Sequence, residues 1–225
     1  MNNLLHLCLF ACSLIAGTAC DAQSGGTPEG ANAAAGQATS QVGGYCDTCE
    51  LMYVGMPENI DATDTSASWN AAGQKLRVSG TIYKHDGKTP APNVILYYWQ
   101  TNSEGIYADS KGLDPKVRPH GYIRGWVKTD AQGHYSLYTT RPGHYPGRSG
   151  PAHIHLLVKE PRLPSEYYID DILFEDDPLL TKAHRNKLEN RGGSGIVQTR
   201  QENDLQVAIR DIVLGQNIPG YPEAD

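Results

Sequence analysis

The sequence predicts an all-β protein, an antiparallel β-sandwich with long loops and one or two short helices. Three observations predict this fold. From residue 76 onward, short runs rich in Val, Ile and Tyr alternate with turn signals such as His85-Asp86-Gly87. No strand–helix–strand pattern of the kind that builds a parallel sheet separates these runs. The 225 residues are enough for one domain with a sizeable core, and too few for two domains plus a leader.

Residues 1–22 are expected to be an export signal. Residues 4–15 form an apolar run that is too short for a permanent membrane helix. Small residues before Cys20 resemble a lipoprotein cleavage box, whose cysteine becomes lipidated and tethers the chain to a membrane. The match to that box is imperfect, so simple cleavage after Ala19 or Ala22 is the alternative. Either route predicts a mature chain outside the cytoplasm, as a periplasmic or cell-envelope lipoprotein or as a secreted protein.

Residues 23–44 are predicted to be a flexible linker, because small and polar residues dominate them and bulky apolar side chains are almost absent. The domain is expected over residues 45–225, with its core at about 75–215. Its two cysteines, Cys46 and Cys49, predict a local structural disulfide in an oxidising compartment. A zinc site would require a second pair of ligands, and a thioredoxin-like site would require an adjacent strand–helix pattern.

The β-sandwich is expected to contain a series of short strands, each bounded by turn residues. The expected strands are 76–83, 93–99, 123–129, 135–140 and 151–158, followed by an extended run over 167–174. The third and fourth of these are joined by a turn, because Asp130-Ala131-Gln132-Gly133 between them is a turn sequence.

The C-terminal part contributes one helix and one irregular strand to this scheme. Asp177 followed by proline is typical of the N-cap and first turn of a short helix, which we expect to end near Leu188. Residues 205–214 are predicted to be a bulged strand, because the apolar residues alternate and shift parity between Ile209 and Ile212. A helix is the alternative from composition.

Composition narrows the kinds of partner. The formal net charge is −6 and the Lys and Arg residues are scattered, so no nucleic-acid partner is indicated and a small or neutral partner fits better. The chain has 13 Tyr against 2 Phe. Many aromatic positions therefore carry a hydroxyl that can ligate a metal or form a hydrogen bond.

His153 and His155 are candidate metal ligands. Side chains alternate between the two faces of a strand, so both imidazoles point the same way while Ile154 and Leu156 point to the opposite layer. The two histidines can therefore reach one metal ion. The alternative is a chance pair on a half-exposed strand.

Two tyrosines could complete this set. Tyr107 and Tyr145 lie on loops at strand ends, where a sandwich presents functional side chains. Two phenolates and two neutral imidazoles suit ferric iron, Fe(III), better than zinc or calcium. The alternative for each tyrosine is a packing role with its hydroxyl in solvent. The other histidines, His120 among them, are expected at the surface or in hydrogen bonds.

Several longer motifs occur in one order between about residues 75 and 215: Gly80-Thr81-Ile82-Tyr83, Pro92-Asn93-Val94, Trp99-Gln100-Thr101-Asn102, Gly125-Trp126-Val127-Lys128-Thr129-Asp130, Thr140-Arg141-Pro142-Gly143-His144-Tyr145-Pro146, Pro151-Ala152-His153-Ile154-His155, Phe174-Glu175-Asp176-Asp177-Pro178-Leu179 and Asp211-Ile212-Val213-Leu214. With these motifs the chain resembles the intradiol ring-cleavage dioxygenases, the family of the protocatechuate and catechol dioxygenases.

The resemblance implies a site and an activity. Tyr107 and Tyr145 would be phenolate ligands and His153 and His155 imidazole ligands of a non-haem Fe(III) cofactor. A catecholic substrate would be cleaved by O2 between its two hydroxyl-bearing carbons to a muconate-type diacid, with Tyr145 able to act as a base. Self-association as a homo-oligomer is a further option that the resemblance leaves open.

One position departs from the family pattern. The family typically has Arg immediately before the Pro-Ala-His-Ile-His motif, and this chain has Gly150. Loss of such a cation would cost about 2 to 4 kcal/mol of transition-state stabilisation. Arg148, two residues earlier in the chain, is the hypothetical substitute for it. Two functions therefore remain, a dioxygenase and an exported β-sandwich binding or structural module with a vestigial iron site. Further candidates for the pocket, by proximity in the chain, are Tyr98, Ile106, Trp126 and Arg141.

Overall fold

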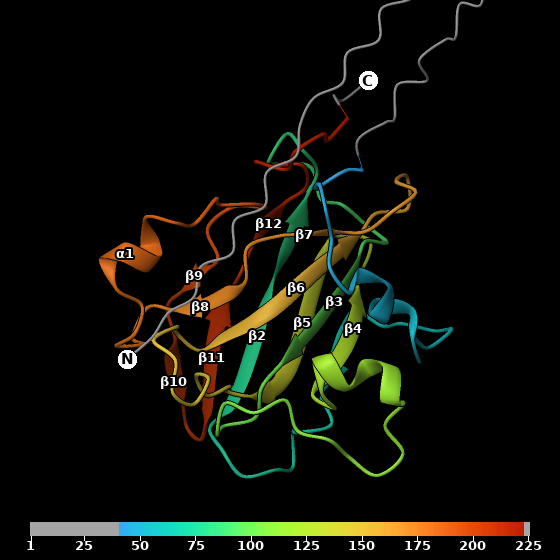
Figure 1. Cartoon of the computed structure of the whole chain (residues 1–225). Coiled ribbons are helices and arrows are strands. Elements are labelled where there is room, and N and C mark those ends of the chain that lie inside the picture. The colour runs from blue at the N-terminus through green and yellow to red at the C-terminus, as the bar shows by residue number, and fades with distance from the viewer. Residues whose placement is uncertain (1–40, 223–225) are drawn as a thin grey trace, which may run out of the picture. The chain divides into compact units, whose positions relative to one another are not determined.

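The computed structural model describes residues 41–222, and within them two six-stranded β-sheets form the domain (Figure 1). The first sheet has the order β1 (Thr63–Thr65), β5 (His134–Thr140), β2 (Lys75–Tyr83), β11 (Leu205–Ile209) and β10 (Arg200–Glu202), with β12 (Ile212–Val213) also on β2. The second has the order β4 (Arg124–Lys128), β3 (Ile95–Gln100), β6 (His153–Lys159), β8 (Ile172–Phe174) and β9 (Ile196–Val197), with β7 (Tyr167–Tyr168) on β6.

The main core lies between the two sheets. Alternation places one face of each strand inward, as on β2, where Leu76, Val78 and Ile82 are fully buried. The same cluster contains Leu96 of β3 and Ile154 of β6 from the second sheet. The all-β sandwich expected from the sequence is therefore confirmed.

Both sheets combine antiparallel and parallel pairs of strands. β2 pairs antiparallel with β5, and β3 pairs antiparallel with both β4 and β6. The parallel pairs are β1 with β5, β11 with β2, β12 with β2, and β8 with β9. Parallel pairing needs long connections, and the loops of this domain supply them.

The expected helix is shorter than predicted and begins later. α1 covers only Lys182–Arg185, and Thr181 is its N-cap, with a side chain that accepts a hydrogen bond from the backbone N–H of His184. Asp177 was the wrong N-cap because its carboxylate caps only a turn at 178–179, which ends before α1, and also makes a tertiary contact. That carboxylate accepts hydrogen bonds from the backbone N–H of Leu179 at 2.8 Å and of Ala152 at 2.8 Å. Asp177 thereby holds the residue just before β6, the strand that carries His153 and His155. Two 3-10 helices, η1 (Cys49–Tyr53) and η2 (Pro115–His120), complete the helical elements of residues 41–222.

Residues 205–214 form two short strands instead of a bulged one. β11 and β12 pair with β2 in one unbroken register, so no extra residue is inserted. Ile209, expected to alternate inward, is 71% exposed. The ladder is interrupted where the Arg210 carbonyl approaches Gly80 of β2, so closely that a Cβ there would lie 2.0 Å from the oxygen. Tyr135 donates a hydrogen bond of 2.6 Å to the same carbonyl, so a buried acceptor is satisfied away from the ladder.

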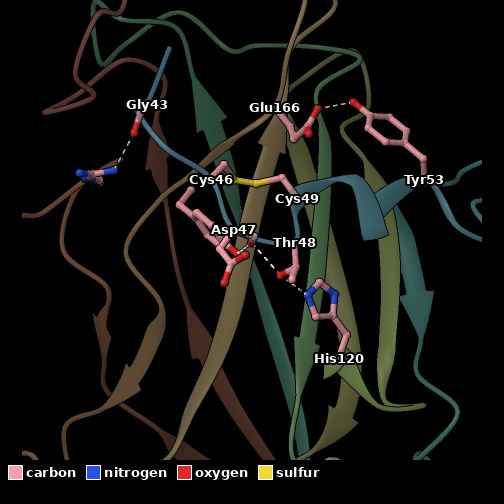
Figure 2. The surroundings of a disulfide bond; sticks show 10 residues. Gly43, Cys46, Asp47, Thr48, Cys49, Tyr53, His120 and Glu166 are labelled. Carbon is pink, nitrogen blue, oxygen red and sulfur yellow. Dashed lines mark hydrogen bonds between the residues drawn. A yellow bond between two sulfur atoms is a disulfide. The ribbon is translucent and has the colours of Figure 1, made fainter. Parts of the chain in front are cut away.

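The segment before β1 covers the outer face of the second sheet. The predicted disulfide between Cys46 and Cys49 is confirmed (Figure 2). Cys49 and Met52 pack with Tyr97, Trp99 and the buried side chain of Leu157 in a second apolar cluster. This cover explains why β3 is apolar on both faces.

The expected export signal, including Cys20, lies outside the described residues, as does most of the expected linker. The last four linker residues, 41–44, are described, and they lie against the domain. The backbone N–H of Gly43 donates to the carbonyl of Pro219 at 2.8 Å, and Val42 packs on the main core. Within residues 41–222, no helix is both long and apolar enough to cross a membrane.

Removing the disulfide is expected to lower stability. The bond closes a short loop, so the double variant Cys46→Ser with Cys49→Ser should lose about 2 kcal/mol of unfolding free energy. Urea unfolding of the full chain measures this loss. The parent chain in a thiol reductant is the control and should show the same loss, whereas equal stability of the oxidised parent and the double variant would contradict the prediction.

Candidate metal centre

The two histidines of β6 lie as the strand pattern predicts. His153 and His155 are partly exposed on one face, while Ile154 and Leu156 are fully buried in the main core on the other. The pairing of β6 with β3 and β8 fixes the strand between two neighbours. The imidazoles are therefore carried by a rigid part of the domain.

The two tyrosines come from loops that are held together by backbone contacts. Tyr107 lies in the loop after β3, and Tyr145 in the loop after β5. The backbone N–H of Gly143 donates to the carbonyl of Asn102 at 2.8 Å, and the Thr101 hydroxyl donates to the carbonyl of Gly143 at 2.8 Å. Gly105 has φ 80° and approaches the second loop so closely that a Cβ would lie 1.8 Å from the carbonyl oxygen of His144. Only glycine permits this approach.

A side chain at Gly105 is expected to push apart the loops that carry Tyr107 and Tyr145. Gly105→Ala adds a clash with backbone to an unfavourable positive φ, so we expect a loss of about 3 kcal/mol of unfolding free energy in urea. Gly112→Ala is the matched control, because Gly112 also has a positive φ, 87°, but open space around its Cβ position. It should cost only about 1 to 2 kcal/mol. Equal losses in the two variants would contradict the role assigned to the contact.

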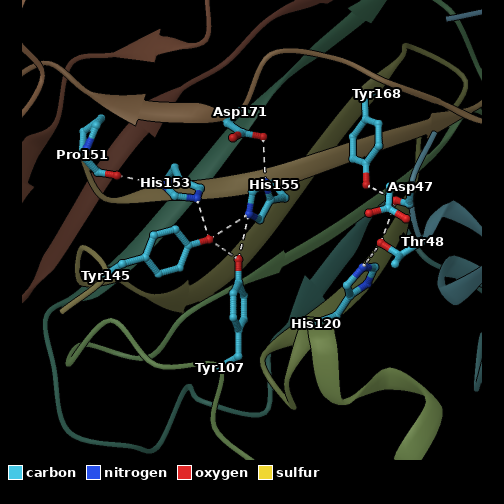
Figure 3. A network of polar contacts seen from close by, with 10 residues as sticks. All are labelled: Asp47, Thr48, Tyr107, His120, Tyr145, Pro151, His153, His155, Tyr168 and Asp171. Atoms are coloured by element: carbon cyan, nitrogen blue, oxygen red, sulfur yellow. Dashed lines mark hydrogen bonds and ion pairs between the residues drawn. The ribbon is translucent and has the colours of Figure 1, made fainter. Parts of the chain in front are cut away.

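The four side chains converge on one point (Figure 3). The hydroxyl oxygen of Tyr107 lies 2.6 Å from that of Tyr145 and 2.8 Å from Nε2 of His155. The Tyr145 hydroxyl lies 3.1 Å from Nε2 of His153 and 3.4 Å from Nε2 of His155. Donor atoms bound at about 2 Å to one metal lie roughly 3 Å from each other, so the spacing suits a shared ion.

The far nitrogens of the two imidazoles have different partners. Nδ1 of His153 lies 2.8 Å from the carbonyl oxygen of Pro151, and Nδ1 of His155 lies 3.1 Å from Oδ1 of Asp171. His153, His155 and Asp171 also place one donor atom each within 4.8 Å of one another. Asp171 was not predicted from the sequence, because an aspartate before a strand is ordinarily a solvated residue.

Burial sets the charge state of the cluster. It raises the pKa of the Tyr107 hydroxyl far above its usual range, with the nearby Tyr145 adding to the effect, and it raises the pKa of Tyr145 as well. Burial also lowers the pKa of His153. Burial opposes ionisation of Asp171, but its contacts with His155 outweigh this and lower the pKa of the carboxyl. The lowered pKa values favour a neutral His153 imidazole and an ionised Asp171 carboxylate, which are the forms that support a cation.

A pocket of about 760 Å³ opens beside the cluster. Tyr145, His153 and His155 line it, whereas Tyr107 does not. Arg148 lines it as well, with its guanidinium carbon 5.6 Å from the centre of the Tyr145 ring. Further lining residues are Trp99, Gly150, Tyr168, Asp170, Asp171, Leu173, His184, Lys187 and Arg191.

The further pocket candidates chosen by proximity in the chain were wrong. Tyr98 is buried in the main core and donates to Asp64 at 2.7 Å, and the indole N–H of Trp126 donates to the carbonyl of Met52. Arg141 pairs with Asp176, and Ile106 is 49% exposed. Side chains that are adjacent in a loop or strand point in different directions. Proximity in the chain is therefore a poor guide to pocket residues.

His120 is a buried hydrogen-bonding residue. It is 2% exposed, with Nδ1 at 2.8 Å from the Tyr97 hydroxyl and Nε2 at 3.0 Å from the Thr48 hydroxyl. Burial lowers its pKa to about 3, so it is neutral. The Trp99 ring stacks on His120 at 4.1 Å and on His155 at 4.7 Å between ring centres. Trp99 thereby fixes the plane of one candidate ligand.

The fold and this cluster define a β-sandwich protein with a candidate metal site of phenol and imidazole groups beside a pocket. The family model described as Dioxygenase matches residues 53–191, which is more than half of the chain. The chain therefore belongs to the intradiol ring-cleavage dioxygenase family. The matched range includes all four side chains of the cluster.

Individual relatives agree with this assignment. The beta chain of protocatechuate 3,4-dioxygenase from Burkholderia cepacia is 31% identical over 114 residues, 48% of this chain and 48% of that protein. Catechol 1,2-dioxygenase 1 from Acinetobacter lwoffii is 28% identical over 171 residues, 63% of this chain and 53% of that protein. The chain thus spans about half the length of these curated relatives.

Solved structures share the fold. The dioxygenase domain of a carbohydrate-binding fusion protein from Streptomyces sp. SirexAA-E superposes with a TM-score of 0.51 at 23% identity, covering 71% of this chain and 91% of that domain. Hydroxyquinol 1,2-dioxygenase from Pseudomonas putida DLL-E4 gives a TM-score of 0.50 at 21% identity, covering 70% of this chain and 62% of that chain.

Proposed function

We propose that this chain is a non-haem Fe(III) dioxygenase that cleaves a catecholic ring with O2, between the two hydroxyl-bearing carbons, to a muconate-type diacid. The observation that carries the proposal is the convergence of the donor atoms of Tyr107, Tyr145, His153 and His155 at the edge of a pocket. Membership of the intradiol dioxygenase family supports it.

The donor set favours ferric iron over other ions. Two phenol oxygens become anionic ligands that match a trivalent charge, and imidazole is a common ligand of iron. Zinc sites of proteins use cysteine, histidine and carboxylate, and calcium takes oxygen ligands in larger number. The residues present therefore fit Fe(III), and Tyr107, Tyr145, His153 and His155 are the side chains that would hold it.

Each ligand has a distinct setting for this chemistry. A ferric ion held there would supply positive charge that attracts the catechol oxygens and would activate the ring toward O2. Tyr145 is the candidate base that takes a proton from a catechol hydroxyl, because it lines the pocket and Tyr107 does not. Tyr107 does not line the pocket, and its hydroxyl lies beside Nε2 of His155, so Tyr107 would remain a ligand when a substrate enters. Trp99 and Tyr168 wall the pocket and orient a flat ring.

Arg148 is the proposed source of positive charge at the ring. Its guanidinium lies over Tyr145 and lines the pocket, while Gly150 leaves the neighbouring position without a side chain. A cation there stabilises negative charge that develops on the substrate. Arg148→Ala should therefore lower kcat for catechol cleavage roughly tenfold to a hundredfold with the iron content unchanged, and unchanged turnover would remove Arg148 from the reaction.

The test of the proposal is metal content, colour and oxygen uptake of the full chain. After loading with ferrous ion in air, ferric phenolate coordination should give an intense visible absorption, and a panel of catechols should then consume O2 and yield diacids. A colourless, iron-free chain would overturn the metalloenzyme. Colour without oxygen uptake would favour the alternative function, a β-sandwich binding or structural module with a non-catalytic iron site.

We also propose that the chain is exported and tethered through Cys20. The apolar leader supports export, and the disulfide between Cys46 and Cys49 supports an oxidising compartment. Labelling with a radioactive fatty acid should mark the parent chain and not Cys20→Ser. An unlabelled parent chain recovered outside the cytoplasm would point to simple signal cleavage instead.

A further inference from the structure

Asp171 lies opposite a candidate ligand in the second sheet. The antiparallel register pairs His153 with Leu173 and Ile154 with Ile172. Continued by one residue, the same register sets Asp171 opposite His155, where cross-strand side chains are neighbours. The observed distance of 3.1 Å between Oδ1 of Asp171 and Nδ1 of His155 agrees with this placement.

The two nitrogens of His155 face different groups. Nε2 lies toward the tyrosine hydroxyls, at 2.8 Å from Tyr107, and is the nitrogen that a shared ion would use. Nδ1 must then carry the proton and donate a hydrogen bond to the Asp171 carboxylate. Because Asp171 lies behind the imidazole, it cannot share the ion that Nε2 binds without a rearrangement.

The second histidine has a weaker partner. Nδ1 of His153 donates to the neutral carbonyl of Pro151, whereas Nδ1 of His155 donates to a carboxylate. Within the described part of the chain, the only ion-pair partner of Asp171 is His155, so no Lys or Arg neutralises this carboxylate. Its negative charge therefore acts on His155.

We propose that Asp171 is a positioning residue that fixes the Nδ1–H tautomer of His155 and makes it the stronger of the two imidazole donors. A carboxylate behind a ligating histidine holds the ring orientation and increases its basicity. The proposal rests on the proposed iron site for its effect on the metal. The additional negative charge makes a ferric ion a weaker electron acceptor.

A charge-neutral, isosteric replacement tests the effect on the metal. Asp171→Asn keeps an acceptor oxygen but removes the charge, so after loading the full chain with ferrous ion in air the phenolate-to-iron absorption should move to longer wavelength. The dissociation constant for iron should rise about tenfold to a hundredfold. Glu175→Gln is the matched control, because Glu175 is an exposed carboxylate just after β8 that pairs with Arg185. The control should keep the parent wavelength, and a parent wavelength in Asp171→Asn overturns the proposal.

A second measurement is independent of iron. In the metal-free full chain, ¹⁵N NMR of the imidazoles should report His155 as the Nδ1–H tautomer, and Asp171→Ala should weaken this preference. His153 serves as the internal control, because its partner is the Pro151 carbonyl and should be unaffected. An Nε2–H tautomer of His155 in the parent overturns the proposal whatever the metal content. A parent chain with the expected tautomer that binds no iron would overturn the proposed function and the donor effect, and leave the positioning contact standing.

Discussion

His153→Ala is expected to abolish ferric-iron binding and the visible absorption of the loaded chain. The imidazole lies 3.1 Å from the Tyr145 hydroxyl and lines the pocket, so its removal leaves three donors and an opening to solvent. We expect the affinity for iron to fall by more than about a hundredfold, since loss of a supporting residue alone costs ten- to a hundredfold. Iron content per chain and absorbance after gel filtration measure the loss.

His144→Ala is the control for this variant. His144 is an exposed imidazole next to Tyr145 in the chain, and no hydrogen bond joins its side chain to the cluster in the described structure. This variant should bind iron as the parent does. A His153→Ala chain with the parent's iron content and colour would show that the ion lies elsewhere.

Gly150→Arg is expected to raise the turnover of catechol cleavage about a hundredfold. Gly150 lines the pocket, nothing lies within 4 Å of the position of an added Cβ, and its φ is not in the left-handed region. An arginine therefore fits the backbone without strain and can extend its guanidinium toward the substrate. Steady-state oxygen uptake at equal iron content measures kcat.

Gly150→Gln separates charge from bulk. It also replaces the glycine and adds a polar side chain, shorter than that of arginine and without a charge, so its kcat should stay near the parent value. Equal turnover in the Arg and Gln variants would show that positive charge at this position does not limit the reaction. A fall in KM alone for Gly150→Arg would assign the added arginine to binding and contradict the expected rise in kcat.

The strand pattern was sufficient to predict the two-layer fold and the common direction of His153 and His155. Both depend on the local alternation of side chains, which the sequence displays directly. The meeting of Tyr107 with Tyr145 depends instead on the packing of two loops through Gly105, and no local period encodes that contact. Family resemblance, and not periodicity, supplied this part of the site.

Other features escaped prediction because tertiary contacts determine them. Asp177 has the sequence of a helix N-cap, but its carboxylate caps only a turn at 178–179 and also accepts a hydrogen bond from the N–H of Ala152, just before β6. Ile209 has the sequence of an inward strand residue, but it faces solvent beside the interrupted ladder of β2. Asp171 could be found only from the register between β6 and β8, which a single sequence does not reveal.

With the proposed iron site loaded, the backbone contact between the two tyrosine loops would make the visible absorption a measure of loop closure. Tyr107 and Tyr145 are 38 residues apart, and they meet only when the loops after β3 and β5 have closed on each other. A chain with intact strands but a displaced loop would keep its β-sheet signal in circular dichroism and lose its tyrosine-to-iron absorption. Comparing the two signals during refolding would therefore show whether closure of the loops occurs with formation of the sheets or after it.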